Sequence, residues 1–288
     1  MAQRVRKHGG WLEGHRGETV VVKFGGNAMI DERQARAFAE DIVALQRAGL
    51  RPIVTHGGGP QISAELIAHG IRSEFRGGLR VTTPDAVAVV RDVLTRIGAE
   101  LAARIQAAGG AAVAIAVAGD GEPAIFTARR TGTVVDGEPV DLGRVGEIVA
   151  VDSRPVQAVL SAGGIPVVSA IATEEGSWGL LNVNADTAAG SLAIAVSADR
   201  LLLLTDVAGL YRDWPNRDSL VTTIDTAELA ELLPSLEAGM IPKLAACHDA
   251  VEAGVGSASI LDGRVAHILL AEPFGASGTT VTTTRIAS

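Results

Sequence analysis

The chain has 288 residues, a net charge of −8, 47% apolar residues and only 3% aromatic residues. This acidic composition lacks the clustered basic surface that nucleic-acid binding needs, and the single cysteine, Cys247, excludes an intrachain disulfide and a cysteine-rich metal site. The longest charge-free apolar stretch, 107–119, is too short to cross a bilayer, and no apolar segment follows the basic N-terminus, so we expect a cytoplasmic protein.

The first part of the chain alternates short apolar runs with segments of helical periodicity. Residues 19–22 and 52–55 are runs rich in β-branched residues, and they predict buried strands. Residues 34–48 carry apolar side chains at helical spacing and predict a helix that ends before a glycine. Two further helices are expected to open at Pro60 and Pro84, because proline fits the first turn of a helix.

The following part continues the alternation and adds one irregular region. Apolar runs at 113–117, 165–168 and 201–204 predict three more strands. Residues 127–151 mix charged, glycine and β-branched residues, which predicts an antiparallel hairpin that turns near Asp136. Buried apolar strands separated by helices are typical of an α/β fold with a mainly parallel central sheet covered on both faces.

We expect one domain, 1–288, divided into two lobes. The polar, glycine-containing segment 173–179 follows an apolar strand and is the best candidate for the boundary. The N-terminal lobe would then cover about 19–176 and the C-terminal lobe about 177–288.

Lysine is rare, with three lysines against twenty-two arginines. Lys23 and Lys243 each lie beside a turn marked by glycine or proline. An ammonium group is a compact charge on a flexible stem, which suits it to follow a phosphoryl group as it moves. The composition therefore indicates phosphate chemistry at these two positions, with an ordinary solvated surface lysine as the alternative for Lys243.

Two glycine-rich junctions follow predicted strands. Gly25 and Gly26 come after the first strand, and Gly57, Gly58 and Gly59 come after the second. Glycine lets backbone N–H groups approach an anion closely, and a helix that starts there adds a partial positive charge. The alternative is a tight strand-to-helix turn without a ligand. Neither the P-loop pattern nor the usual dinucleotide-binding glycine pattern occurs.

A short polar segment precedes a helix predicted over 187–196. Asn182 and Asn184, two residues apart, project to one side of an extended segment and suit a polar ligand. Asp186 extends this polar set, or it simply caps the helix. Arg80, just before another predicted helix, can clamp a carboxylate with both arms of its guanidinium, and a surface ion pair is the alternative.

Two remaining features bear on ligands. The loop 205–211 closes a strand with polar residues and a glycine, and α/β proteins usually bind ligands at such strand ends. His56, His248 and His267 show no mutual spacing that suggests a zinc site, so we interpret them as structural or incidental.

Six motifs in a fixed order carry a resemblance that spans about residues 19–281. They are KFGGN at 23–27, HGGGPQ at 56–61, GGLRVT at 77–82, NVNAD at 182–186, TDVAGLY at 205–211 and GMIPK at 239–243. Together they resemble the amino acid kinase superfamily and, within it, the acetylglutamate kinases. The joint pattern is specific, although each motif alone is not.

The resemblance implies a three-layer αβα sandwich whose N-terminal lobe binds the acyl-amino acid and whose C-terminal lobe binds ATP. Carried over by motif, Lys23 and Lys243 would stabilise the transferring γ-phosphoryl group, and Asp186 would orient both lysines. It further assigns N-acetyl-L-glutamate to Gly58, Gly59, Arg80, Asn182 and Asn184, and the phosphates and nucleotide to Gly25, Gly26, Thr205, Asp206, Gly209, Tyr211, Gly239 and Met240.

The implied reaction is ATP-dependent phosphorylation of the side-chain carboxylate of N-acetyl-L-glutamate in arginine biosynthesis. Mg²⁺ would be carried mainly by the ATP phosphates, so we name no protein ligand for it. The implied partners are the two substrates, further copies of the chain in a dimer or larger homo-oligomer, and a nitrogen-signalling regulatory protein in some relatives. No nucleic acid or membrane is expected to bind.

Both ends of the chain depart from arginine-inhibited members of the family. Glycines at 9, 10, 14 and 17 disfavour the long N-terminal helix that links dimers into a hexamer, and the loop 273–279 is short. Arginine inhibition and a hexamer are therefore not predicted. Two alternatives stay open: a kinase for a related acceptor, such as carrier-linked aminoadipate or another modified glutamate, and a non-catalytic metabolite sensor.

Overall fold

The structure is a computed structural model, and it describes residues 12, 14–29, 31–115, 124–135, 137–177, 179–236, 239–271 and 278–283. Most of the two departures at the chain ends, and the tip of the predicted hairpin at residue 136, lie outside these residues. Within the described part, no helix combines the length and the apolar character that a membrane crossing requires.

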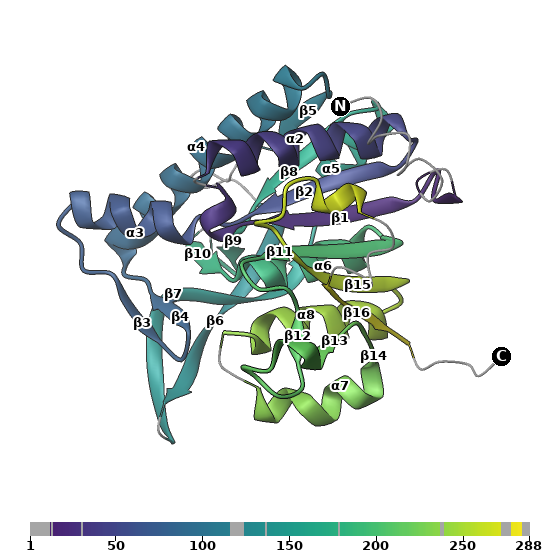
Figure 1. Cartoon of the computed structure of the whole chain (residues 1–288). Coiled ribbons are helices and arrows are strands. Elements are labelled where there is room, and N and C mark those ends of the chain that lie inside the picture. The colour runs from purple at the N-terminus through teal and green to yellow at the C-terminus, as the bar shows by residue number, and fades with distance from the viewer. Residues whose placement is uncertain are drawn as a thin grey trace.

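An eight-stranded sheet forms the centre of the molecule (Figure 1). Its strands, in spatial order, are β14 (Thr223–Asp225), β16 (Gly278–Thr282), β15 (Ser257–Asp262), β11 (Arg200–Thr205), β1 (Thr19–Phe24), β2 (Arg51–His56), β8 (Ile165–Ser169) and β5 (Ala112–Ala114). All neighbours from β15 to β5 run parallel, and only β16 is antiparallel to β15. The prediction of a mainly parallel central sheet is confirmed.

Successive residues of β1 point into different cores, which places a helical layer on each face of the sheet. Val21 packs with the helices α5 (Arg154–Ser161), α6 (Ala185–Ala195), α7 (Thr226–Leu232) and α8 (Ile241–Glu252). Val20 and Val22 pack with α2 (Glu32–Arg47) and α4 (Pro84–Ala107). The result is a three-layer αβα arrangement, with α2 and α4 above the sheet and α6, α7 and α8 below it in Figure 1.

Helix starts follow the capping chemistry of the sequence. Asp31 accepts hydrogen bonds from the amides of two residues in the first turn of α2. Thr83 does the same for Ala86 at the start of α4, where proline occupies the first position. The helices predicted over 34–48 and from Pro60 and Pro84 are confirmed, the second of these being α3 (Gly59–Ala68).

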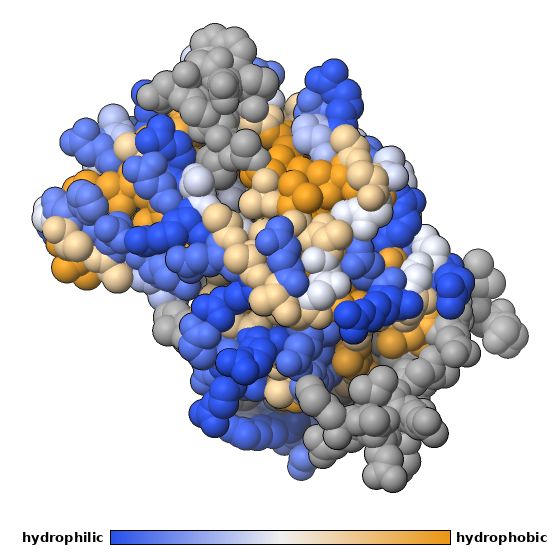
Figure 2. All heavy atoms as spheres, turned by 90° about the horizontal axis from the view of Figure 1, so that it is seen from above, coloured by the Kyte–Doolittle hydropathy of each residue, from blue (hydrophilic) through white to orange (hydrophobic). Residues whose placement is uncertain are grey.

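The layer of α2 and α4 presents mostly hydrophilic side chains with apolar patches between them (Figure 2).

A small closed barrel lies beside the sheet. It consists of β6 (Phe126–Val135), β7 (Glu138–Val151), β9 (Ile171–Glu174) and β10 (Leu180–Val183). The antiparallel pairing of β6 with β7 confirms the predicted hairpin. Of the segment 173–179, expected at the lobe boundary, residues 173–174 end β9, residues 175–177 follow in a turn, and residue 178 lies outside the described residues. Two short antiparallel pairs complete the fold: β3 (Glu74–Arg76) with β4 (Leu79–Val81), and β12 (Leu210–Tyr211) with β13 (Leu220–Val221).

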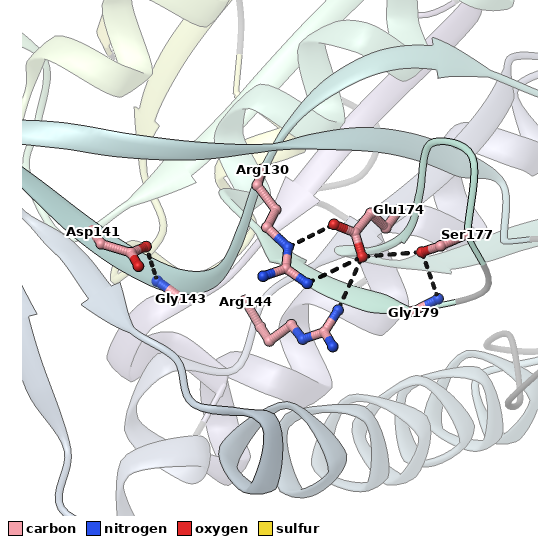
Figure 3. Close-up of polar contacts among 7 residues, drawn as sticks. All are labelled: Arg130, Asp141, Gly143, Arg144, Glu174, Ser177 and Gly179. Carbon is pink, nitrogen blue, oxygen red and sulfur yellow. Dashed lines mark hydrogen bonds and ion pairs between the residues drawn. The ribbon is translucent and has the colours of Figure 1, made fainter.

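Glu174 ties three parts of this barrel together (Figure 3). Its carboxylate accepts hydrogen bonds from Arg130 of β6 at 2.5 Å, from Arg144 of β7 at 2.9 Å and from Ser177 at 3.0 Å. Since Ser177 lies in the turn that follows β9, this network links β6 and β7 to that turn. Asn182, a predicted ligand residue, lies on β10.

Candidate active site

The carboxyl ends of β1, β2 and β11 open onto a cleft of about 280 Å³. Strand ends of this kind are the usual ligand site of open α/β sheets. The predicted site residues that line the cleft are Lys23, Gly25, Gly26, Gly58, Gly59, Arg80, Asn182, Asn184, Thr205, Asp206 and Lys243. Residues from the first and the last quarter of the chain thus share one cavity.

Asp186 lies between two lysines that line this cleft. The ammonium nitrogen of Lys23 is 2.9 Å from Oδ1 in an ion pair, and that of Lys243 donates a hydrogen bond to Oδ2 at 2.9 Å. Asp186 is only 4% exposed and Lys23 7%. Burial alone would raise the pKa of Asp186, but the two ammonium charges offset this and bring it down to about 2. The carboxylate therefore stays ionised and holds both cations at the cleft.

The local sequence explains why the Asp186 carboxylate is available. The side chain of Asn184 accepts hydrogen bonds from the amides of Asp186 and Thr187 at 2.8 and 3.1 Å, so Asn184 is the N-cap of α6. The alternative in which Asp186 caps the helix is wrong. Asp186 stands in the first turn, where the helix dipole favours a negative charge, while Lys243 stands in the first turn of α8 and needs the carboxylate to offset the opposite effect.

The two glycine junctions present free backbone donors to the cleft. In the part of the chain that the structure describes, the amides of Gly25, Gly26, Gly58 and Gly59 donate to no protein acceptor. At two of these positions a side chain would have to displace a neighbouring one. A Cβ on Gly25 would lie 2.9 Å from the Lys23 ammonium nitrogen, and one on Gly58 would lie 2.7 Å from the side chain of α4 beneath it. Free N–H groups beside two ammonium groups form a site for an anion.

Arg80 is buried, yet no acidic partner faces it among the described residues. Its guanidinium donates to the carbonyl of Gly59 at 2.9 Å, to the hydroxyl of Ser63 at 2.8 Å and to the hydroxyl of Ser73. The ring of Phe75 lies 4.6 Å from the guanidinium carbon. Burial lowers the pKa of Arg80, although the group stays cationic because its ordinary pKa is above 12. A positioned cation without a carboxylate suits an anionic ligand better than the surface ion pair considered as its alternative.

Asn182 borders the cleft on the barrel side. Its amide nitrogen donates to the hydroxyl of Thr82 at 3.2 Å, which orients the side chain. Asn184 also lines the cleft, but its amide oxygen is used by the helix cap, so the two asparagines do not act as equivalent ligands.

The remaining predicted residues do not line this cleft. Gly209 packs against Thr279, with a virtual Cβ 2.5 Å from the threonine hydroxyl, and the ring of Tyr211 lies 5.2 Å from that of Trp214. Met240 occupies the N-cap position of α8, without a side-chain hydrogen bond to the helix, and packs against the core. Gly239 precedes it in the chain. Sequence reasoning missed Phe75, which lines the cleft although aromatic residues are scarce in the chain.

Three comparisons place the chain among known proteins. The model of the amino acid kinase family matches residues 18–262. The chain belongs to this family. An acetylglutamate kinase from Kineococcus radiotolerans is 56% identical over 276 residues, covering 93% of this chain and 91% of that protein. One from Clavibacter michiganensis subsp. michiganensis is 58% identical over 270 residues, covering 93% and 88%.

Solved structures show the same fold. An N-acetylglutamate synthase from Neisseria gonorrhoeae, complexed with coenzyme A and N-acetyl-glutamate, has a TM-score of 0.82 at 24% identity. The match covers all of this chain and 65% of that one, so the chain spans about two thirds of that enzyme. A carbamate kinase from Giardia lamblia bound to AMP-PNP has a TM-score of 0.64 at 17% identity, covering 93% of this chain and 99% of that one.

Proposed function

We propose that the chain transfers the γ-phosphoryl group of ATP to the side-chain carboxylate of N-acetyl-L-glutamate, giving N-acetyl-L-glutamyl 5-phosphate for arginine biosynthesis. Relatives at 50–58% identity, whose matches cover 93% of this chain and 88–91% of the relatives, bear the name acetylglutamate kinase. The observation that carries the proposal is the Lys23–Asp186–Lys243 set at a cleft lined by free glycine amides.

The chemistry asks for positioning and charge neutralisation rather than for a strong base. A carboxylate oxygen of the acceptor attacks the γ-phosphorus, the bond from that phosphorus to the ADP oxygen breaks, and no proton has to move. Charge spreads over the equatorial phosphoryl oxygens in the transition state. Lys23 and Lys243 supply two cations there, and the amides of Gly25, Gly26 and the second junction supply hydrogen bonds.

Asp186 has an indirect part in this scheme. Two ammonium groups held close together repel each other, and they would swing apart or lose a proton without a counter-charge between them. The buried carboxylate contacts both at 2.9 Å and fixes their separation before any substrate binds. We therefore assign Asp186 to orienting the lysines rather than to proton transfer.

The acceptor would bind on the side of the cleft formed by α3, β4 and β10. The Arg80 N–H groups that do not bond Gly59, Ser63 or Ser73 suit a carboxylate of N-acetyl-L-glutamate, and Asn182 suits a polar group of the same molecule. Gly58 and Gly59 line the same cleft and would lie between this acceptor site and the phosphoryl site. The acceptor carboxylate and the phosphoryl group can thus be aligned on one row of backbone donors.

The nucleotide would lie toward β11, whose end carries Thr205 and Asp206 into the cleft. Gly209, Tyr211, Gly239 and Met240 would lie along the nucleotide beyond this cleft. No group of three or more His, Cys, Asp or Glu side chains able to hold a metal occurs among the described residues. Mg²⁺ in kinase sites uses phosphates, water and one or two carboxylates, and Asp206 is the carboxylate that borders the cleft.

The family resemblance is also the basis for proposing a cytoplasmic homo-oligomer and a nitrogen-signalling partner.

Activity itself is tested with purified protein, ATP and Mg²⁺, by trapping the acyl phosphate with hydroxylamine. Turnover on N-acetyl-L-glutamate should far exceed turnover on glutamate, aspartate or aminoadipate derivatives. The Lys243→Ala variant should lose turnover while it stays folded. Absence of wild-type turnover on N-acetyl-L-glutamate would falsify the proposal.

A further inference from the structure

His56 is a fully buried imidazole immediately behind the second glycine junction. It ends β2, is 0% exposed and precedes Gly57 directly. Its Nδ1 lies 3.1 Å from the carbonyl oxygen of Gly57, and its Nε2 lies 3.0 Å from the hydroxyl of Ser169 on β8. The imidazole therefore contacts the backbone of the junction itself.

The helix above His56 is adapted to it. Gly98 lies inside α4, and a Cβ there would come within 3.0 Å of Nε2 and 3.4 Å of the Ser169 hydroxyl. Glycine in a helix interior costs about 1 kcal/mol relative to alanine. The missing Cβ at Gly98 leaves room for the His56 ring where it approaches α4.

The contacts fix which nitrogen carries the proton. A carbonyl oxygen can only accept a hydrogen bond, so Nδ1 must be the donor to Gly57. In the neutral ring Nε2 is then unprotonated and accepts from the hydroxyl of Ser169 at 3.0 Å, which is a closer contact than the 3.4 Å from that hydroxyl to the carbonyl oxygen of Leu94. Burial lowers the pKa of His56 to about 4, so the ring is neutral around pH 7 and its protonation pattern does not change there.

The orientation of Gly57 decides where the next amide points. A trans peptide is planar, so the N–H of Gly58 is directed opposite to the carbonyl of Gly57. The imidazole holds that carbonyl on the buried side, which turns the N–H of Gly58 away from the core. Gly58 lines the cleft, and its N–H has no acceptor within the described residues.

We propose that His56 is a positioning residue that locks the Gly57–Gly58 peptide so that the Gly58 N–H is presented to the anion in the cleft. The inference rests on the proposed phosphoryl transfer and names a residue that acts on it without touching substrate. The hydroxyl of Ser169 contacts Nε2 on the opposite side of the ring and so helps to hold the imidazole in this orientation. Without the imidazole, the peptide is free to rotate, since glycine on both sides offers little steric resistance.

Two substitutions at one position separate positioning from packing. In His56→Asn the side-chain amide can take the place of Nδ1 and donate to Gly57, whereas His56→Leu fills the space without a donor. Removing one oxyanion donor costs roughly 10²–10³-fold in kcat, so a donor left free to rotate should cost about 10-fold or more. We expect that loss in His56→Leu, kcat within about threefold of wild type in His56→Asn, and a small change in KM for both.

Melting temperatures show whether both variants are folded, and the wild-type protein gives a test that needs no substitution. Long-range ¹H–¹⁵N spectra of His56 should report the Nδ1–H tautomer. An Nε2–H tautomer, equal kcat losses in the two variants, or full activity in His56→Leu would overturn the inference. A wild-type enzyme without turnover would reject the proposed function instead, so the two failures are distinguishable.

Discussion

The buried carboxylate of Asp186 gives the sharpest prediction, because a surface aspartate provides a matched control. The pKa of Asp152 is also held at about 2, chiefly by a hydrogen bond from Arg154, but this pair lies at the surface. Asp186 has the same pKa with 4% exposure. We compare Asp186→Asn with Asp152→Asn, since both substitutions remove one charge and keep the side-chain shape.

The magnitudes follow from burial. A shift from 3.8 to about 2 corresponds to roughly 2 kcal/mol of folding stability for Asp186. Removing its charge also leaves two cations without a counter-ion, and breaking a buried pair costs roughly 3–5 kcal/mol. Loss of the Asp152 charge should cost under about 1 kcal/mol, since solvent screens exposed pairs. We expect kcat to fall at least about 100-fold in Asp186→Asn, because both ammonium groups lose their position, and to stay unchanged in Asp152→Asn.

The measurements are kcat with N-acetyl-L-glutamate and urea unfolding between pH 7 and pH 2. The folded-state pKa of Asp186 is lowered, so its contribution to stability is present above pH 3.8 and is lost as pH falls toward 2. The stability gap between wild type and Asp186→Asn should therefore narrow over that range. Equal destabilisation by the two substitutions, or kcat within threefold of wild type in Asp186→Asn, would refute the reasoning.

Three further substitutions test other parts of the site. Gly25→Ala should lower kcat about 10-fold or more with little change in melting temperature, because the new Cβ displaces only the flexible end of Lys23. Arg80→Lys should raise KM for N-acetyl-L-glutamate about 10-fold and leave KM for ATP unchanged. Lysine lacks the planar guanidinium group whose Nη2 donates to the carbonyl of Gly59, so its cation is not held in the same position. Equal changes in the two KM values would contradict this. Glu174→Gln should lower the free energy of unfolding by about 1 kcal/mol, measured in urea, and an unchanged value would show that the barrel network is not stabilising.

Much of the fold could be predicted because its information is local. The continuous apolar runs of β1, β8 and β11 mark strands buried on both faces, and all three lie inside the central sheet. The strand predicted over 113–117 corresponds to β5, which covers Ala112–Ala114, while residues 116–117 lie outside the described residues; β5 is the edge strand, and Val113 is 46% exposed. The closed barrel could not be foreseen, because β9 and β10 are short and their pairing with the long hairpin depends on contacts distant in sequence.

The site shows the same division between local and distant information. Rare lysines and glycine junctions pointed to the cleft, and the structure brings Lys23, Lys243 and Asp186 together. The sequence could not decide between Asn184 and Asp186 as the helix cap, since both residues favour that position and the choice depends on two lysines far away in the chain. The sequence indicates only a structural or incidental role for His56, because the positioning role that we propose depends on backbone direction, which composition and spacing do not report.

The three charged groups at the cleft come from β1, α6 and α8, so they meet only when widely separated parts of the chain have docked. A ribosome-bound chain that ends before residue 243 already contains Lys23 and Asp186, yet it lacks Lys243. Catalysis should therefore be the last native property to return on refolding, after helical content and strand pairing. Its time course would report when the C-terminal segment settles onto the sheet.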